Sequence, residues 1–398
     1  MHQIKFVDEA NITNKKILLR VDFNVSLTDG FTIADDARIK QSVPTIQYLL
    51  KNNNRLILVS HLDRPQTRDP KYSLRIVVEH LRLLLPDYPI NLVDDFLSEE
   101  GKQQIRNQKE NEILLLENIR FYAQEKENSQ EFAKQLSSLA KLYVNDAFGV
   151  SHRTDASIVS VPHYLPSYGG LLLKKEVATI SKTINEAKKP VVAILGGTKI
   201  TTKIGLMGRL MEIADYLLVG GGIANTFLCA QGIDVGQSYC EYEKVEKARQ
   251  LLFLAAQKNT AILFPQDVVI GERTNSENGG VVKKIEEIPA NGDVLDIGPE
   301  TQAIFGSIIA KARTIIWNGP VGYFENPAFA RGTEFVYYSI TQNQDAVSIV
   351  GGGETIAAIS KEEYLEKITH ISTGGGAMLE FIETETLPGI EALKKGSP

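Results

Sequence analysis

The sequence predicts an α/β protein with two doubly wound parallel-sheet domains joined by an interdomain helix and hinge. Short apolar runs alternate with longer amphipathic segments along all 398 residues, which favours parallel sheets covered by helices on both faces. Two such series follow one another, and a segment with several prolines and glycines separates them. The length allows two or three domains, each with its own core.

The first series contains five apolar runs that predict buried strands. They are Ile17–Phe23, Arg55–Ser60, Ile90–Asp95, Glu112–Asn118 and Lys141–Phe148. Helical spacing of apolar residues predicts helices between them, for example over Asp36–Asn52 and Ser73–Leu85.

The seam between the series lies between residues 161 and 190. It begins with Pro162, Pro166 and Gly169-Gly170, and continues as an apolar-periodic helix that must end before Pro190. We therefore expect a first domain over residues 1–169, an interdomain helix over 170–189 and a second domain from residue 190.

The second series predicts a further parallel sheet. Its strand candidates are Val191–Gly197, Tyr216–Gly221, Ala261–Phe264, Thr314–Asn318, Ala346–Gly351 and Ile368–Thr373. The stretch Gly271–Val282, rich in Asn, Glu and Gly, predicts a surface loop or hairpin.

Composition narrows the class of protein. The net charge of −6 argues against a nucleic-acid surface, and no apolar run has membrane-spanning length. The N-terminus lacks the order of a signal peptide. Two cysteines, Cys229 and Cys240, fit neither a disulfide framework nor a zinc pattern, so we expect free thiols in a reducing cytoplasm.

Polar residues follow the strand candidates of the first series, where ligands bind in open α/β sheets. They are Arg20, Asp22, Asn24, Ser60, His61, Arg64, Glu117, Asn118, Arg120, Asn145, Asp146, His152 and Arg153. Recurrent arginine suits bidentate binding of phosphate or carboxylate. Taken singly, His61 fits a structural histidine, Asp22 and Asn24 fit turn residues, and several others fit helix caps.

Glycine turns mark the second series. Gly196-Gly197, Gly220–Gly222, Gly351–Gly353 and Gly374–Gly376 each follow an apolar run, and bare backbone at a strand-to-helix turn exposes N–H groups to phosphate. Lys199 and Lys203 lie one helical turn apart after the first of them, which indicates a polyphosphate seat.

Acidic residues near these turns, among them Asp296, Glu325 and Glu354, are candidate Mg²⁺ ligands, usually through water. A favourable first-turn carboxylate is the competing interpretation of Glu354. The chain has no P-loop motif, no G-x-G-x-x-G and no protein-kinase motif set.

Eight ordered motifs resemble phosphoglycerate kinase over essentially the whole chain. They are RVDFN (20–24), SHLDRP (60–65), LLENIRF (115–121), NDAFGVSHR (145–153), GGTK (196–199), WNGPVGYFE (317–325), GGGET (351–355) and STGGGA (372–377). The resemblance implies reversible phosphoryl transfer from 1,3-bisphosphoglycerate to MgADP by hinge-bending domain closure, in glycolysis and gluconeogenesis. It further implies that residues 387–398 return to the first domain, which leaves 190–386 as the second.

The resemblance also implies roles for individual residues. Phosphoglycerate would be held by Asp22, Asn24, Arg38, His61, Arg64, Arg120 and Arg153. The nucleotide would be held by Lys199, Lys203, Gly220, Gly221, Asn318, Glu325, Gly351, Gly352, Gly353, Glu354, Thr355 and Thr373. Arg38, Lys199, Gly374 and Gly375 would serve catalysis, and Glu354 would serve Mg²⁺.

This chemistry needs no general base, because the acceptor in the reverse direction is an ionised carboxylate. Positioning and electrostatic stabilisation would carry the reaction. We expect a cytoplasmic monomer whose partners are 3-phosphoglycerate or 1,3-bisphosphoglycerate and ADP or ATP, with Mg²⁺ as cofactor and no nucleic acid or membrane.

Four positions depart from the family pattern. Asp63 stands where glycine is usual, Ser26 where proline is common, Thr202 where many members have aspartate, and Glu354 where aspartate is usual. A non-catalytic binding protein with a degraded site is therefore the main alternative. A Rossmann-type dehydrogenase is a third hypothesis, but its glycine motif is missing.

Overall fold

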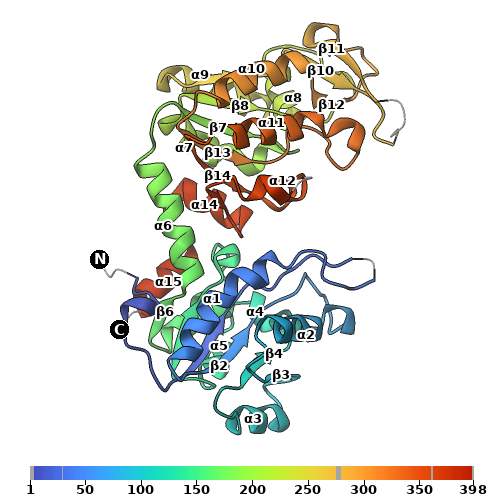
Figure 1. The fold of residues 1–398 in the computed structure, drawn as a ribbon. Helices are drawn as coiled ribbons and strands as arrows, with labels where there is room; N and C mark the ends of the chain where they lie inside the picture. Colours follow the sequence, from blue (N-terminus) through green and yellow to red (C-terminus); the bar gives the residue numbers. More distant parts are fainter. Residues whose placement is uncertain (1–3, 29, 275–278, 360–361, 397–398) are drawn as a thin grey trace. The chain divides into compact units, whose positions relative to one another are not determined.

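Two compact units divide the chain (Figure 1). The computed structural model describes residues 4–28, 30–274, 279–359 and 362–396. Unit 1 comprises Met1–Ala178 together with Thr386–Pro398, and unit 2 comprises Thr179–Glu385. The boundary falls inside helix α6, Leu171–Asn185, which ends before the lysine pair and the proline that follow it.

Unit 1 is built on a six-stranded parallel sheet with strand order β3-β4-β2-β1-β5-β6. Its strands are β1 Lys16–Arg20, β2 Arg55–Val59, β3 Ile90–Val93, β4 Ile113–Leu116, β5 Leu142–Asn145 and β6 Ser167–Gly169. Its helices, besides the start of α6, are α1 Ala37–Lys51, α2 Arg75–Leu84, α3 Glu99–Arg106, α4 Ala123–Lys126, α5 Gln130–Ser137 and α15 Pro388–Gly396.

Burial explains why the strands of unit 1 form a parallel sheet. Three successive residues of β1, Ile17, Leu18 and Leu19, are each at most 1% exposed, so both faces of the strand are covered. The core on one face joins Ile17 and Leu19 to apolar residues of α1 and α2. The polar residues of β1 therefore stand at its two ends, where Lys16 is half-buried and Arg20 is buried.

The C-terminal segment belongs to unit 1. Helix α15 contacts β6 and two short helical turns, η5 (Ala156–Ser160) and η6 (Val161–His163). The N–H of Gly389 donates to the carbonyl of Ser151 at 2.8 Å. The segment thus packs against the region that follows β5.

Unit 2 contains a second six-stranded parallel sheet, with strand order β15-β14-β13-β7-β8-β9. Its strands are β7 Val191–Leu195, β8 Tyr216–Val219, β9 Ala261–Leu263, β13 Thr314–Asn318, β14 Val347–Gly351 and β15 His370–Ile371. Its helices are α7 Ile204–Ile213, α8 Gly221–Ala230, α9 Val245–Lys258, α10 Pro299–Ile309, α11 Arg331–Gln342, α12 Gly353–Ala357, α13 Glu362–Leu365 and α14 Gly375–Thr384.

A small antiparallel sheet accompanies the parallel sheet of unit 2; the sequence indicated a loop or hairpin in this region but not a three-stranded sheet. Its strands, in the order β11-β10-β12, are β10 Asp267–Ile270, β11 Val281–Lys284 and β12 Val294–Ile297. Strand β10 ends just before the expected loop or hairpin at 271–282, β11 begins inside it, and their antiparallel pairing fits the hairpin; residues 275–278 lie outside the described part.

The parallel sheets confirm the predicted fold class, and the strand ends show where the predictions overran. Strand β1 ends at Arg20 rather than Phe23, and β5 ends at Asn145 rather than Phe148. Strand β6 was missed because Pro166 and Gly169 favour a turn. Among the described residues, none of the helices combines the length and the apolar character needed to cross a membrane.

Candidate active site

Each parallel sheet has a point where the strand order reverses, and ligands bind at such points beyond the carboxyl ends of the strands. In unit 1, β1 lies between β2 and β5, so the segments after these strands meet. In unit 2, β7 lies between β8 and β13. Most of the predicted site residues follow these strands or β14 and β15.

A cluster of cationic and imidazole side chains lies at the reversal point of unit 1. We call it the basic cluster, and its members are Arg20, Arg38, His61, Arg120 and Arg153. The positive charges of all four arginines act on His61, whose side chain is buried. The structure therefore brings together residues that are separated by more than a hundred positions in the chain.

Asp22 and Asn24 lie next to Arg38, one member of the basic cluster. Nη1 of Arg38 donates to the carbonyl of Asn24 at 2.7 Å and lies 3.6 Å from Oδ2 of Asp22. Oδ1 of Asn24 accepts the N–H of Asp63 at 2.7 Å. The predicted turn-forming role of Asn24 and its predicted place in the site are thus compatible.

Asp63 connects two parts of this site through its backbone. Its φ of 56° is left-handed, a conformation that suits glycine and that aspartate tolerates better than most residues. Its carbonyl accepts Nη1 of Arg120 at 2.7 Å. The backbone geometry explains why glycine is usual here in the resembling family. Its Oδ1 accepts the N–H of Arg64 at 2.8 Å, and the Arg64 side chain is exposed.

Arg120 and Arg153 carry buried donors that the protein leaves unused. Nε and Nη2 of Arg120 and Nε of Arg153 are buried and make no hydrogen bond within the described part of the chain. Nη2 of Arg120 lies 3.7 Å from Asp155, an ion pair without a hydrogen bond. Burial, followed by the charge of Arg153, lowers the pKa of Arg120 to about 10, so its charge persists at neutral pH. Unused buried donors are costly unless a ligand accepts them.

His61 is a neutral hydrogen-bonding group at physiological pH. Burial, followed by the charges of Arg20 and Arg120, holds the pKa of its imidazole well below the ordinary value of 6.5. Nη2 of Arg20 lies 3.4 Å from Nδ1, which therefore accepts and leaves the proton on Nε2. Although Asp22 lies 3.9 Å from Nδ1, burial and four positive charges outweigh this single carboxylate.

Arg20 supports the basic cluster through its own hydrogen bonds and was not among the predicted ligands. Its Nε donates to Oγ of Ser157 at 2.9 Å, and that hydroxyl donates to Oε1 of Glu125 at 2.5 Å. Burial raises the pKa of Glu125 to about 7 against the lowering effect of Arg20. The position of Arg20 at a strand end was visible in the sequence, but its partners Ser157 and Glu125 gave no local signal.

Lys203 lies at the reversal point of unit 2. Its ammonium donates to the carbonyl of Gly196 at 2.5 Å and approaches the carbonyl of Asn318 at 3.3 Å. The N–H of Gly196 donates to the same Asn318 carbonyl at 3.0 Å, which joins the turns after β7 and β13. Only 8% of Lys203 is exposed, whereas Lys199 is exposed. Lys203 is thus a buried residue between the turns after β7 and β13, whereas Lys199 is exposed to solvent.

The turn after β14 packs against Asn318. Gly352 has a φ of 114°, and a side chain there would approach Nδ2 of Asn318 to 2.8 Å. Nδ2 of Asn318 donates to the carbonyl of Gly351 at 2.6 Å. The hydroxyl of Thr355 accepts the N–H of Gly319 at 2.7 Å and lies 3.0 Å from the carbonyl of Gly351. These side chains fix the shape of the turn, so Thr355 has its backbone N–H rather than its hydroxyl to offer a phosphate.

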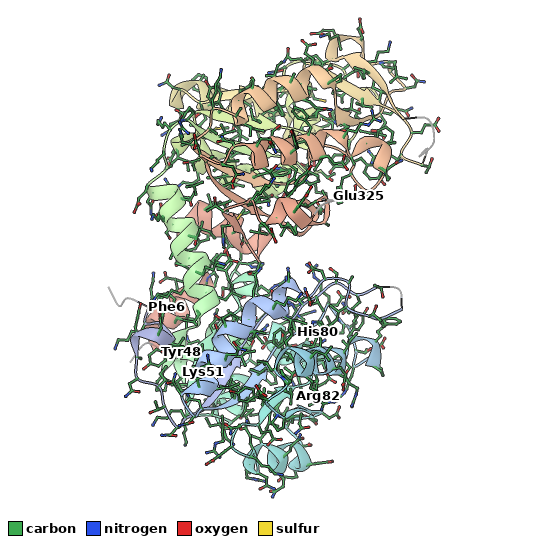
Figure 2. The ribbon with its side chains drawn as sticks, viewed as in Figure 1. Phe6, Tyr48, Lys51, His80, Arg82 and Glu325 are labelled. Carbon is green, nitrogen blue, oxygen red and sulfur yellow. The ribbon has the colours of Figure 1, made fainter. Side chains whose placement is uncertain are left out.

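Most of the other predicted nucleotide residues lie at the starts of helices in unit 2. Gly220 precedes α8 and Gly221 begins it, and the N–H of Gly221 donates to the carbonyl of Val321 at 3.0 Å. Gly374 precedes α14 and Gly375 begins it, with Thr373 just before them. Gly353 begins α12. Glu325 is exposed at the surface of unit 2 (Figure 2).

The position of Glu354 suits a carboxylate that binds a metal ion together with a ligand. It is exposed in the first turn of α12, and no hydrogen bond or ion pair joins its carboxylate to another described residue. Its charge acts on Lys203 and raises the pKa of that ammonium, opposing burial. Mg²⁺ often binds one protein carboxylate together with substrate phosphates, which matches this arrangement.

Asp296, by contrast, is not available to a metal ion. It is 3% exposed, and it accepts the N–H of Gly332 at 2.7 Å and that of Ile297 at 2.8 Å. Burial raises its pKa to about 7. The candidate metal role is therefore wrong for this residue, which supports the turn before α11 instead.

The nucleotide-binding role that the resemblance implies for Lys203 predicts a characteristic pH dependence. Burial lowers the pKa of its ammonium from 10.5 to about 8. If ATP is a substrate, as the motif resemblance implies, its kcat/KM should fall above pH 8 as this charge is lost in the free protein. Bound phosphates stabilise the ammonium, so kcat should remain level to higher pH. Initial rates between pH 6 and 10 test this, and a kcat/KM profile that stays level through pH 9.5 would contradict it.

Comparisons with known proteins agree with this geometry. The sequence pattern described as phosphoglycerate kinase matches residues 7–385. A phosphoglycerate kinase of Dictyoglomus turgidum is 44% identical over 386 residues, covering 97% of each chain. A protein of Nicotiana tabacum named "Phosphoglycerate kinase, cytosolic" is 43% identical over 388 residues, covering 97% of this chain and 96% of its own. The solved phosphoglycerate kinase of Coxiella burnetii has a TM-score of 0.86 at 36% identity, covering 99% of this chain and 100% of its own.

These relatives, together with the two parallel sheets and the glycine turns that begin helices in unit 2, define the chain as a phosphotransferase enzyme. More particularly, it belongs to the phosphoglycerate kinase family, as the motif resemblance indicated.

Proposed function

We propose that the chain transfers the acyl phosphate of 1,3-bisphosphoglycerate to MgADP, reversibly, giving 3-phosphoglycerate and MgATP. The observation that carries the proposal is the set of unused buried donors on Arg120 and Arg153. Buried guanidinium nitrogens that have no hydrogen-bond acceptor in the protein suit a ligand that carries both a carboxylate and a phosphate. The family membership supplies the identity of that ligand.

The residues of unit 1 would bind phosphoglycerate. Arg120 and Arg153 would hold its anionic groups, and neutral His61 would donate from Nε2. Asp22 and Asn24 would orient Arg38, and Arg64 would add a charge from the surface. Arg38 would also contact the phosphoryl group in transfer.

The residues of unit 2 would bind the nucleotide. Lys199, Lys203 and the backbone of Gly374 and Gly375 would contact the phosphates and the transferred group. The turn 220–222 would border adenine, and Glu325 would reach ribose. The turn 351–353, Thr355 and Thr373 would offer backbone groups beside Asn318. Mg²⁺, held by Glu354 and the nucleotide, would neutralise phosphate charge.

No general base is needed, because the attacking carboxylate of 3-phosphoglycerate is ionised at neutral pH. A neutral His61 among arginines is poorly suited to accept a proton, which supports catalysis by charge and position. Closure of the two units about the hinge would exclude water from the acyl phosphate. We propose that the enzyme acts in glycolysis and gluconeogenesis, as a monomer in the cytoplasm.

A coupled assay with ATP, Mg²⁺ and 3-phosphoglycerate tests the reaction. The product acyl phosphate is followed through NADH oxidation by glyceraldehyde-3-phosphate dehydrogenase. We expect a rate that disappears when any one of the three components is omitted. No NADH oxidation with all three components present, or a rate that persists without 3-phosphoglycerate, would contradict the proposal.

A non-catalytic binding protein remains the second candidate, because Asp63, Thr202 and Glu354 depart from the family pattern. Calorimetry would detect nucleotide binding in that case while the coupled assay stayed at background. The retention of Lys199, Lys203 and the basic cluster favours the enzyme.

Glu354 should alter the response to Mg²⁺ without abolishing activity. Compared with aspartate, its extra methylene moves the carboxylate outward and changes the water between it and the metal. We expect Glu354→Asp to shift the Mg²⁺ concentration at half-maximal rate. Glu354→Gln, which removes the charge, should raise this concentration. Glu363→Asp, also an exposed glutamate of unit 2, is the matched control. Identical Mg²⁺ curves for the parent and Glu354→Asp would contradict the assignment.

A further inference from the structure

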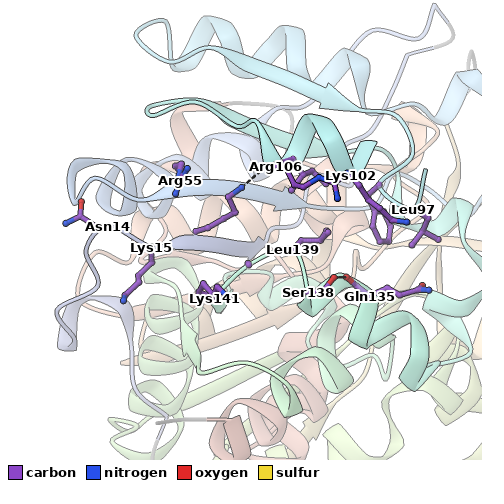
Figure 3. A pocket seen from close by; sticks show the side chains of 14 residues that line it. Asn14, Lys15, Arg55, Leu97, Lys102, Arg106, Gln135, Ser138, Leu139 and Lys141 are labelled. Carbon is purple, nitrogen blue, oxygen red and sulfur yellow. Dashed lines mark hydrogen bonds between the residues drawn. The ribbon is translucent and has the colours of Figure 1, made fainter. Parts of the chain in front are cut away.

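A hollow of about 770 Å³ lies at the amino ends of β1, β2 and β5 in unit 1 (Figure 3). The strand β1 begins at Lys16, beside the hollow, and ends at Arg20, in the basic cluster. The hollow and the basic cluster therefore lie at opposite ends of the strands of the same sheet. The five residues of β1 separate these ends by roughly 13 Å at 3.3 Å per residue. The hollow is therefore separate from the proposed active site.

The lining of this hollow is strongly cationic. Six of its 14 lining residues are basic and none is acidic, although the whole chain has a net charge of −6. The basic residues are Lys15, Lys16, Arg55, Lys102, Arg106 and Lys141. This local positive charge is opposite in sign to the net charge of the protein.

Strand pairing forces three of these cations together. Lys16 and Arg55 are register partners in β1 and β2, so their side chains leave the same face of neighbouring strands. The N–H of Lys141, just before β5, donates to the carbonyl of Lys16 at 2.9 Å. Like charges directly opposite one another in a sheet are destabilising. A row of three therefore carries a cost that a bound anion would remove.

The protein supplies little compensation for these charges. Among the described residues, the side chains of Lys15, Arg55 and Lys141 have no ion pair or hydrogen bond. The ammonium of Lys16 donates to the carbonyl of Ile105 at 2.6 Å, and Glu112 acts on it only at longer range. Glu99 pairs with Lys102 at 2.9 Å and approaches Arg106 at 3.7 Å, but both pairs are exposed and weak.

Burial adds a second sign that Lys16 lacks a counter-ion. Its pKa is lowered first by burial and then by the charge of Arg55, against the opposing effect of Glu112. An anion in the hollow would oppose both effects, because a nearby negative charge raises the pKa of the ammonium. The direction of this shift agrees with the geometry.

We propose that this hollow is a binding site for small polyanions that carry a chain of two or more phosphate groups. Arg55 and Lys141 lie two strand spacings apart, roughly 10 Å, which is more than one phosphate spans. A volume of about 770 Å³ is within the size of small-molecule sites. Lys16 at the centre and Lys15 at the rim complete the contacts. Nucleotides and inorganic polyphosphates share this chemistry.

Lysine labelling of the full chain tests the site directly. The protein is acylated with an amine-reactive ester, and modification at Lys15 and Lys141 is measured by mass spectrometry with increasing sodium tripolyphosphate. We expect saturable protection of both lysines. Equal protection by sodium chloride at matched ionic strength, or no protection at millimolar tripolyphosphate, would overturn the proposal.

A variant assigns the protection to this hollow. Arg55→Gln with Lys141→Gln should weaken tripolyphosphate protection of Lys15 about tenfold or more, since charge-assisted contacts are lost. Lys51→Gln with Lys126→Gln removes the same charge from other exposed positions of unit 1 and should leave protection unchanged. Turnover without tripolyphosphate should be unchanged in both variants. Unchanged protection in the first variant would overturn the assignment.

The source of the phosphate chain is distinguished by repeating the titration with ATP without Mg²⁺. Equal protection of Lys15 by ATP and tripolyphosphate indicates recognition of the phosphate chain alone. Stronger protection by ATP indicates that apolar lining residues such as Leu97 and Leu139 add contacts to the base. Both results support the site, while Lys199 reports nucleotide binding in unit 2 separately.

Discussion

Arg38→Ala is expected to lower kcat by about 10³-fold or more, the effect of removing a guanidinium that stabilises a transferring phosphoryl group. Arg38 is suited to this role because its side chain is 32% exposed and anchored through one nitrogen. Nη1 donates to the carbonyl of Asn24 at 2.7 Å, and Nε and Nη2 make no hydrogen bond to a described residue. Two nitrogens of a positioned fork, Nε and Nη2, therefore remain for a ligand.

The folded state should tolerate Arg38→Ala well, because a partly exposed ion pair contributes less than about 1 kcal/mol. Arg38→Lys keeps the charge but loses the fork, so an intermediate rate is expected. Arg68→Ala is the matched control, since Arg68 is also an exposed arginine paired with a carboxylate, that of Asp94. Steady-state rates and thermal melts check these outcomes. Full activity in Arg38→Ala would show that the site assignment is wrong.

Lys203→Met is expected to abolish turnover and at the same time to raise the melting temperature of unit 2. The ammonium is buried, and its pKa falls from 10.5 to about 8, a change worth about 3 kcal/mol of burial cost. Methionine fills similar space without a charge, although the carbonyl of Gly196 then loses a donor. A net gain of about 1–2 kcal/mol corresponds to roughly 2–8 °C for a unit of this size.

The pH dependence identifies the cause of this stabilisation. Below pH 8, Lys203 is protonated in both the folded and the unfolded state, so the full cost of its burial is present. Between pH 8 and 10.5 the unfolded chain binds more protons at this group, and the stability of the parent rises with pH. The advantage of Lys203→Met should therefore be largest below pH 8 and should shrink toward pH 10.5.

Lys199→Met is the matched control for Lys203→Met. Lys199 is exposed, so its replacement should reduce turnover without raising the melting temperature. Thermal melts at pH 7 and pH 10, together with initial rates, separate the two lysines. A lower melting temperature for Lys203→Met at pH 7 would contradict the account of a buried, costly ammonium.

The sequence predicted the sheets well because their strands are buried on both faces and therefore read as continuous apolar runs. The predictions failed at the carboxyl ends of the strands. Asp22 accepts the N–H of Asn24 at 3.2 Å, and Asn145 accepts that of Ala147 at 3.0 Å, so the chain turns out of the sheet where the site begins. Apolar residues such as Phe23 concealed these turns.

The candidate site could be predicted as a set of residue types but not as a network. Side-chain partners from distant segments, such as Arg20 with Ser157, carry no local pattern. The sequence also could not separate Lys199 from Lys203, since their spacing predicts the same helical face, whereas the structure exposes one and buries the other. Asp296 and Glu354 looked alike as acidic residues, and burial distinguishes them.

The small antiparallel sheet of unit 2 was missed for a related reason. Its strands are only four residues long, and β11 is largely exposed, so its sequence Val281–Lys284 lacks the apolar run that marks a buried strand. Short, exposed strands depend on their partners rather than on their own pattern. Its register with β10 could not be derived from sequence spacing.

The central claim is that this chain transfers a phosphoryl group directly between a nucleotide and a carboxylate without a general base. A rapid-quench experiment with γ-labelled ATP, Mg²⁺ and 3-phosphoglycerate tests it most directly. We predict that label appears in the acyl phosphate within the first turnover, with none in inorganic phosphate. Label that remains in ATP, or that passes to inorganic phosphate regardless of 3-phosphoglycerate, would contradict the account.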